Sequence, residues 1–193
     1  MSLLGNAKTM GGIGALLALI GIFVPTIGGI LSIVGFVLVV VAVKNISDET
    51  KDKAIFNNYL YSFIIEIMAF ASFFIVLFFT LQSVGGISYF MELQNMAYSD
   101  PMEIFSYLEP FLTGAIVAFF VLCIISILST IFYKKSFDSI SEHTGVKWFS
   151  TAALLMLIGA ATLIIVIGIF IILVALIIQI VAFFSLPETL PKK

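Results

Sequence analysis

The sequence is poor in charge, and the little positive charge that it has is carried by one residue type. Only 10% of its 193 residues are charged, all nine basic residues are lysines, and the formal net charge is −2. Such a chain offers no basic stripe that could follow a phosphate backbone. We therefore expect no nucleic-acid partner.

The residues that most enzymes use for catalysis are also scarce. The chain has one cysteine, Cys123, and one histidine, His143. Cys123 has no partner for an internal disulfide and no histidine in its span to activate it, and one histidine cannot pair with another at a zinc ion. Phosphate loops of the Gly-Lys-Ser or Gly-Lys-Thr type are absent, and no aspartate lies in an apolar run. We predict no enzyme activity, no metal site and no cofactor.

Long apolar runs are abundant. Hydrophobic residues make up 62% of the chain, which contains 20 phenylalanines. A run of about 18 or more apolar residues predicts a membrane span, since about 20 helical residues cross a hydrocarbon layer of about 30 Å. Four blocks of this length are present, at residues 11–43, 60–81, 111–133 and 149–186.

Two of these blocks are too long for one crossing. At about 1.5 Å per residue, residues 11–43 and 149–186 would form helices of about 50 and 55 Å. Pro25 and the glycines after it break the first block, because proline lacks an amide donor and glycine has a permissive backbone. The second block contains only glycines, and we place its break near Gly168. Each block is predicted to be a tight helical hairpin.

The sequence thus predicts an all-α fold, a polytopic transmembrane bundle in which residues 1–193 form a single integral membrane domain. The six predicted spans are 10–24, 27–43, 59–82, 111–133, 148–166 and 169–186, and an acidic outer loop covers 83–110. The prolines are expected outside helix interiors; they are Pro25, Pro101, Pro110, Pro187 and Pro191.

The lysines test this count and give an orientation. None lies between Lys53 and Lys134, although that gap contains five acidic residues. With six spans all nine lysines fall on one side, whereas with four spans they divide six to three. Because lysines in short loops mark the cytoplasmic side, we expect a cell-membrane protein with both termini cytoplasmic. A cleaved signal peptide is less favoured, since no small-x-small site precedes a polar segment near Val24.

The first hairpin contains four glycines at seven-residue spacing: Gly14, Gly21, Gly28 and Gly35. Seven residues are nearly two helical turns, so the two glycines of each helix share a face that another backbone can approach. Close helix packing is the favoured interpretation, and a pore lined by exposed backbone is the alternative. Such a face could also support a homo- or hetero-oligomer.

Two weak internal similarities are present. Residues 46–53, ISDETKDK, match residues 140–147, ISEHTGVK, in four identities at an offset of 94. Residues 16–21, LLALIG, resemble residues 154–159, LLMLIG, and each stretch lies at the start of a predicted hairpin. Chance in a low-complexity apolar sequence is the alternative explanation.

Three segments of the chain resemble a known family. ISDETKDKAIFNNYL, SEHTGVKWF and AFFSLP are similar to segments of a mainly archaeal family of integral membrane proteins that is catalogued as a domain of unknown function. The resemblance covers nearly the whole chain. It implies a membrane location and an archaeal source, and it assigns no functional residues.

Glu66 is the only charged residue inside a predicted span. A carboxylate at the centre of a membrane helix costs about 2.5 to 3.5 kcal/mol, so such groups usually face a bundle interior or a water path. Ser126 and Gln179 are predicted at similar depth. In the favoured interpretation a protonated Glu66 forms a hydrogen bond with one of them; in the alternative the three residues form a proton or cation site.

The outer loop contains a helix start at residues 99–103, with Asp100 at the cap and Pro101 at the first helical position. Residues 104–108 are expected on the membrane surface or on the ends of the spans. The acids of the loop could bind a divalent cation through oxygen, but their spacing fits no ion-binding loop, so a solvated face is favoured. These acids are Glu92, Asp100, Glu103 and Glu109.

The most favoured function is that of a multi-pass membrane protein with a structural or interaction role and the lipid bilayer as partner. The alternative is a small proton- or cation-linked carrier or channel centred on Glu66.

Overall fold

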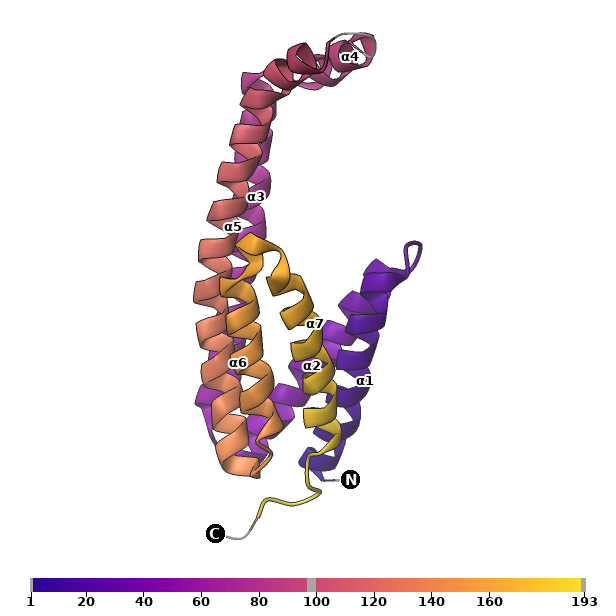
Figure 1. The fold of residues 1–193 in the computed structure, drawn as a ribbon. Coiled ribbons are helices and arrows are strands. Elements are labelled where there is room, and N and C mark those ends of the chain that lie inside the picture. The colour runs from indigo at the N-terminus through magenta and orange to yellow at the C-terminus, as the bar shows by residue number, and fades with distance from the viewer. Residues whose placement is uncertain (1, 97–99, 192–193) are drawn as a thin grey trace. The chain divides into compact units, whose positions relative to one another are not determined.

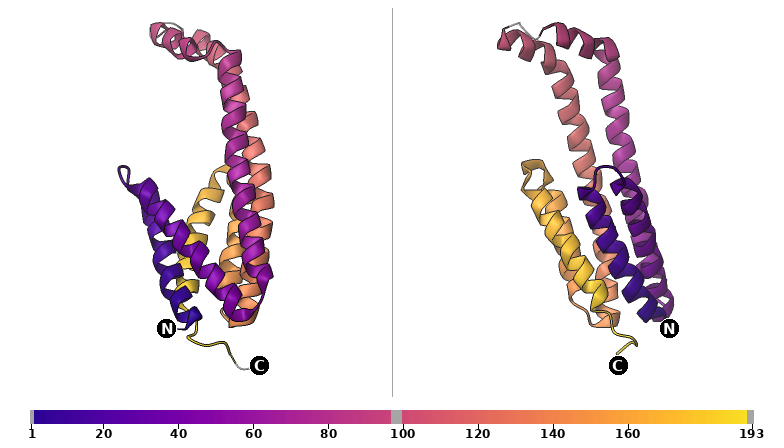
Figure 2. Two further views of the ribbon diagram at one scale, coloured as in Figure 1. Left: turned by 180° about the vertical axis from the view of Figure 1, so that it is seen from behind. Right: turned by 90° about the vertical axis from the view of Figure 1, so that its right-hand side faces the viewer.

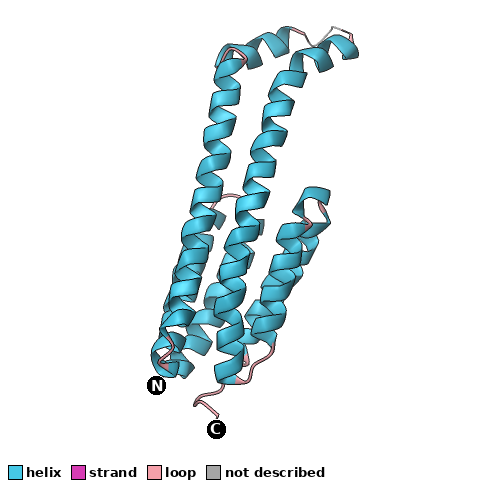
Figure 3. Cartoon of the chain, turned by 90° about the vertical axis from the view of Figure 1, so that its left-hand side faces the viewer, coloured by secondary structure: helices cyan, strands magenta, loops and turns pink. Residues whose placement is uncertain are grey.

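Residues 2–96 and 100–191 of the chain are described by a computed structural model, and within these ranges the secondary structure is helical, with no strand (Figures 1 and 3). The helices are α1 (Leu3–Phe23), α2 (Gly28–Thr50), α3 (Lys53–Ser83), α4 (Ile87–Asn95), α5 (Pro101–Thr144), α6 (Trp148–Ala161) and α7 (Ile167–Phe184), with a 3₁₀ turn η1 (Leu163–Ile165).

Five of the described helices are long and apolar enough to cross a membrane: α1, α2, α3, α5 and α7. Helix α6 is apolar but has only 14 residues. The described residues therefore have the helical fold class that the apolar runs predict. Helix α6 ends five residues before the predicted span 148–166 does.

The chain forms two compact units. One comprises Met1–Ile64 and Ile127–Lys193, and the other comprises Ile65–Ser126. We call them the hairpin unit and the outer unit. Helices α3 and α5 contribute residues to both.

Helices α1 and α2 of the hairpin unit lie side by side as a hairpin (Figure 2). Glycine residues make the closest contacts between them. A Cβ added to Gly14 would lie 2.6 Å from the backbone oxygen of Gly35, and one added to Gly21 would lie 2.5 Å from that of Gly28. The two helices touch at these positions only because no side chain intervenes. The predicted close packing of the seven-residue glycines is confirmed, and it occurs within the hairpin.

The α6–α7 hairpin repeats this contact but turns differently from the prediction. Its break lies at residues 162–166, where Val166 adopts a left-handed backbone with φ of 65°. Gly168, which we expected near the break, belongs to α7 and lies against the backbone of Gly159. The observed turn thus lies a few residues before Gly168, which serves the close helix contact rather than the turn itself.

Aromatic packing joins α5, α6 and α7 at the centre of the hairpin unit. Phe137, Phe149 and Phe183 are fully buried, and their ring centroids lie 5.1 to 6.2 Å apart in edge-to-face arrangements. Phe183 also lies against Gly11 of α1, where a Cβ would collide with its ring. This cluster therefore connects the two hairpins of the unit.

The similar segments ISDETKDK and ISEHTGVK form two similar turns. Each helix ends at a threonine whose hydroxyl donates to a carbonyl four residues earlier, Thr50 to Ile46 at 2.8 Å and Thr144 to Ile140 at 2.7 Å. The next residue is left-handed in both cases, Lys51 with φ of 56° and Gly145 with φ of 76°. The two turns lie at the same end of the hairpin unit as the N-terminus and the end of α7 (Figure 1).

The outer unit consists of the antiparallel α3 and α5 segments and α4. Asp100 caps α5 as predicted, since its Oδ1 accepts a hydrogen bond from the Met102 amide at 2.8 Å. Ser99, with which the predicted helix start begins, lies outside the described residues. Pro110 is inside α5, contrary to the prediction that the prolines avoid helix interiors. Helix α5 changes direction after its first turns (Figure 2), as expected where proline removes a backbone hydrogen bond.

Candidate functional site

The outer unit brings together two of the three polar residues that the sequence places within the spans. Ser126 Oγ of α5 donates a hydrogen bond to Glu66 Oε1 of α3 at 3.0 Å. Ser126 is buried and Glu66 is half-buried. Ser126 is one of the two alternative partners that the structural interpretation of Glu66 named, and the bond links two apolar helices through their polar groups.

The hairpin unit contains a second polar contact between the same helices. Ser62 Oγ and Ser129 Oγ lie 3.1 Å apart, and Ser129 Oγ also lies 2.9 Å from the backbone oxygen of Ser62. Ser62 precedes Glu66 by four residues on α3, and Ser129 follows Ser126 by three on α5, so each pair shares a helix face. These serines could not be predicted from the sequence, because isolated serines are common in apolar helices and nothing marks two of them as partners.

Gln179 is buried on α7, in the hairpin unit. Since Glu66 and Ser126 belong to the outer unit, a shared site of all three residues stays a prediction.

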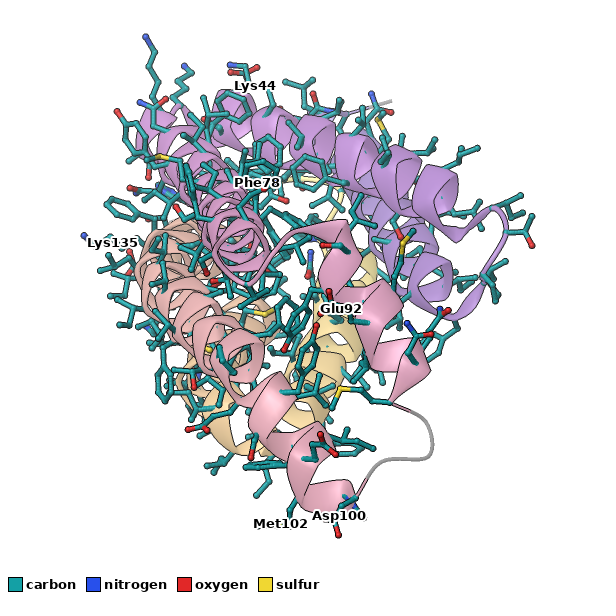
Figure 4. The ribbon with its side chains drawn as sticks, turned by 90° about the horizontal axis from the view of Figure 1, so that it is seen from above. Lys44, Phe78, Glu92, Asp100, Met102 and Lys135 are labelled. Atoms are coloured by element: carbon teal, nitrogen blue, oxygen red, sulfur yellow. The ribbon has the colours of Figure 1, made fainter. Side chains whose placement is uncertain are left out.

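Two acidic residues of the outer loop have local partners. Asp100 caps α5, and Glu92 Oε2 accepts a hydrogen bond from the Tyr107 hydroxyl at 2.8 Å. Among the residues that the structure describes, no three histidine, cysteine or acidic side chains come together in a way that could hold a metal ion. Figure 4 shows Glu92 on α4, and Asp100 and Met102 at the start of α5.

A pair of stacked tyrosines joins α4 to α5. The rings of Tyr89 and Tyr107 are nearly parallel with centroids 4.5 Å apart, and the Tyr89 hydroxyl donates to the backbone oxygen of Tyr107 at 2.5 Å. Burial raises the pKa of Tyr89, because the phenolate would lose its hydration. We call Tyr89, Tyr107 and Glu92 the tyrosine clasp. No sequence pattern predicts the clasp, since its two tyrosines are 18 residues apart on different helices.

The single histidine and the single cysteine have structural surroundings. His143 Nε2 lies 3.2 Å from Asp52 Oδ2, so it connects the two similar turns of the hairpin unit. Cys123 is fully buried on α5 in the outer unit. In the part of the chain that the structure describes, neither residue is hydrogen-bonded to a group with which it would form a nucleophile and base pair.

Two apolar grooves are open at the surface, one in each unit. The groove of the hairpin unit has a volume of about 640 Å³ and lies between α2 and α3, where Phe36 and Phe63 stack with centroids 4.4 Å apart. The groove of the outer unit has a volume of about 570 Å³ and is lined by α3 residues together with Phe90 and Phe111. Apolar and aromatic side chains form nearly all of both linings, and Glu66 lines neither groove.

Comparison with known proteins agrees with the resemblance noted in the sequence. Residues 31–177 match the family described as "Protein of unknown function (DUF996)". The chain belongs to this family. The DUF996 chain is also 38% identical over 190 residues to "Uncharacterized protein MJ1644" of the archaeon Methanocaldococcus jannaschii, a match that covers 98% of this chain and 97% of the relative. No solved structure is significantly similar to this DUF996 chain.

The DUF996 match includes the Glu66–Ser126 contact and the groove between α2 and α3. It begins after α1 and ends before Gln179. Neither the family description nor the relative's name states an activity, so a functional role for this DUF996 protein depends on its own geometry.

Proposed function

We propose that this protein is a non-enzymatic, multi-pass protein of an archaeal cell membrane with a structural or interaction role, six spans and cytoplasmic termini. Helix α6 is the sixth span in this proposal. At about 1.5 Å per residue its 14 residues give about 21 Å, so the bilayer would thin locally beside the α6–α7 hairpin.

The main support for a structural role is the apolar lining of the two surface grooves. An ion or a polar substrate needs convergent polar groups, whereas the side chains that line these grooves are aliphatic or aromatic apart from Ser32. Such surfaces fit lipid chains or the apolar helices of another membrane protein. Helix α3 supports this view, since only 6% of its most apolar 18-residue window is buried.

The lysine positions support the proposed orientation. Lys51 and Lys53 flank the α2–α3 turn, and Lys147 lies at the α5–α6 turn, at one end of the hairpin unit (Figure 1). Lys192 and Lys193, which belong to the same prediction, lie outside the described residues. Lysines in short loops mark the cytoplasmic side.

Cysteine labelling in intact cells tests the topology. In a Cys123→Ala background, we expect Lys51→Cys and Lys147→Cys to resist a membrane-impermeant maleimide until the cells are opened, and Glu103→Cys to react at once. A Lys147→Cys that reacts in intact cells would contradict the cytoplasmic placement of the α5–α6 turn.

A flux measurement tests the structural role against the carrier alternative. Purified protein in phosphatidylcholine vesicles that contain a pH-sensitive dye should show no more proton leak than empty vesicles under an imposed potential. A Glu66→Gln variant should behave identically, because the amide oxygen still accepts the Ser126 hydrogen bond. A protein-dependent flux that Glu66→Gln abolishes would replace the structural role with the carrier.

A further inference from the structure

The end of the outer unit carries two short antiparallel helical segments. They are α4 (Ile87–Asn95) and residues 101–109 of α5, and we call them together the outer platform. The platform runs across the direction of α3 (Figure 1), and the tyrosine clasp holds its two segments side by side. A structure fixed in this way presents defined faces.

Helix α4 has three faces. Tyr89 is only 4% exposed and packs against α5. With about 100° per residue, Ile87 and Phe90 lie on one side of this contact and Ser88 and Glu92 on the other. Phe90 is 40% exposed and its ring also lies against that of Phe111. Ile87 is 72% exposed, so among the described residues the apolar side of α4 is only partly covered within its unit.

The α5 segment has the same arrangement. Tyr107 faces α4, Phe105 and Leu108 lie on one side of it, and Glu103 and Ser106 lie on the other. Phe105 is 58% exposed. Going around each helix in the direction in which successive residues turn, the polar side comes first, then the side packed against the other helix, and then the apolar side. In two antiparallel helices that touch, this order places both apolar sides on the same side of the pair.

The groove of the outer unit shows which way this apolar side faces. Phe90 of the platform lines that groove with Phe74 and Phe78 of the apolar stretch of α3. The apolar side therefore faces back along the part of α3 that is long and apolar enough to span, and the acidic side faces away from it.

We propose that the outer platform lies flat in the outer interface of the bilayer, with Ile87, Phe90 and Phe105 buried among lipid chains and Glu92 and Glu103 in water. A helix with one apolar face and one polar face binds at this depth by burying the apolar face about 5 to 10 Å into the boundary between headgroups and chains. The outer segment 83–110 has four acids and no lysine, so the lipid surface that fits it is zwitterionic rather than anionic.

The proposal depends on the proposed membrane location, and adjacent residue pairs test it. In a Cys123→Ala background, single cysteines replace Ile87 and Phe105 on the apolar side and their neighbours Ser88 and Ser106 on the polar side. Phe74→Cys serves as the control for the span. Each variant carries a bimane label and is reconstituted in phosphatidylcholine vesicles, and its secondary structure is checked against the unsubstituted protein.

Nitroxide lipids and aqueous iodide then quench the labels from opposite directions. We expect headgroup-proximal nitroxide lipids to quench the labels at positions 87 and 105 at least threefold more than those at 88 and 106, with the reverse order for iodide. Equal quenching within both pairs, or protection of the apolar-side labels from both quenchers by a partner protein, would overturn the proposal. If lipid does not quench the label at position 74, the proposed membrane location is wrong. If lipid quenches that label while the two pairs show no difference, only the proposal for the outer platform is wrong.

Discussion

The α1–α2 hairpin and the α3–α5 pair are held together in different ways. In the hairpin, Gly14 lies against Gly35 and Gly21 against Gly28, so the two backbones touch. In the α3–α5 pair, the contacts include hydrogen bonds between side chains, Ser126 to Glu66 at 3.0 Å and Ser62 to Ser129 at 3.1 Å. Lipid chains are as apolar as leucine, so helices in a membrane associate through close packing and through polar contacts rather than through the hydrophobic effect.

The two kinds of contact suit different positions in the chain. Close backbone contact needs no polar group, and it suits a hairpin whose connection, residues 24–27, already keeps the helices together. Hydrogen bonds suit α3 and α5, which are separated in sequence by α4 and must find each other. A single interhelical hydrogen bond in a membrane contributes about 0.6 kcal/mol on average, whereas overpacking a close contact costs up to about 3 kcal/mol.

The largest expected effect comes from Gly14→Leu. Its Cβ would lie 2.6 Å from the backbone oxygen of Gly35 and 2.7 Å from Leu38 Cβ, so the hairpin would have to open, at a cost of about 3 kcal/mol or more. Thermal unfolding in detergent, followed by circular dichroism, measures the loss. The matched control is Gly29→Leu in the same hairpin, where an added Cβ meets nothing within 4 Å. Equal destabilisation by both substitutions would refute the close contact.

The next effect tests the polar contact. Ser126→Ala leaves Glu66 without its donor, and we expect a loss of about 1 kcal/mol in the free energy of unfolding. Denaturation of the protein in mixed micelles by sodium dodecyl sulfate measures it. Glu66→Gln keeps an acceptor for Ser126 and should change stability by less than about 0.5 kcal/mol. A variant Ser126→Ala that is as stable as the parent would show that the hydrogen bond contributes nothing to the pair.

A smaller, local effect is expected at the tyrosine clasp. Tyr89→Phe removes the hydrogen bond to the Tyr107 carbonyl and should weaken the α4 contact by about 1 kcal/mol, seen as faster amide exchange in α4 but not in α1.

The clasp should also depend on pH. Because the pKa of Tyr89 is raised in the folded protein, its contribution is fully present below the unfolded value of about 10 and is lost as the pH rises through the folded value. The protection of the α4 amides, relative to their base-catalysed exchange in an unfolded chain, should therefore fall above about pH 10 in the parent, and Tyr89→Phe should reduce that fall. An identical pH profile in the two proteins would contradict this assignment.

The smallest effect is expected for an exposed polar contact. Lys44 Nζ lies 2.7 Å from Asp48 Oδ1 on α2, and both side chains are about half exposed. Asp48→Asn should change stability by less than about 0.5 kcal/mol, because solvent screens the pair and ordering two long side chains costs entropy. The same denaturation in mixed micelles provides the measurement. A loss as large as that of Ser126→Ala would mean that burial does not decide which polar contacts matter.

Much of the helical architecture could be predicted from the sequence. The apolar runs identified the long helices, the seven-residue glycines identified the close contact of α1 and α2, and Asp100-Pro101 identified the start of α5. These features follow from local chemistry: the length of an apolar run, the absence of a side chain, and a cap followed by a residue without an amide donor.

The failures of prediction have a common cause in tertiary structure. The α6–α7 turn places a valine, Val166, in the left-handed region, which residue preferences disfavour. Pro110 lies inside α5 at an exposed position, where water can hydrate the carbonyl that proline leaves without a donor. The tyrosine clasp and the Ser62–Ser129 contact join residues far apart in the chain. For the candidate site, Ser126 and Gln179 were both predicted at a depth in the membrane similar to that of Glu66, so the sequence could not choose between them as its partner. Only Ser126 lies in the same unit as Glu66.

The glycine contacts of the first hairpin have a consequence for membrane insertion. Helix α1 has a mean hydropathy of 1.4, the lowest among the five long apolar helices, whereas α2 has 2.3. Its glycines expose backbone that lipid cannot satisfy as well as a partner helix can. Because the α1–α2 connection is only four residues long, α2 follows immediately and can cover that face. We therefore expect the two helices to insert as one unit, with the more apolar α2 helping α1 into the bilayer.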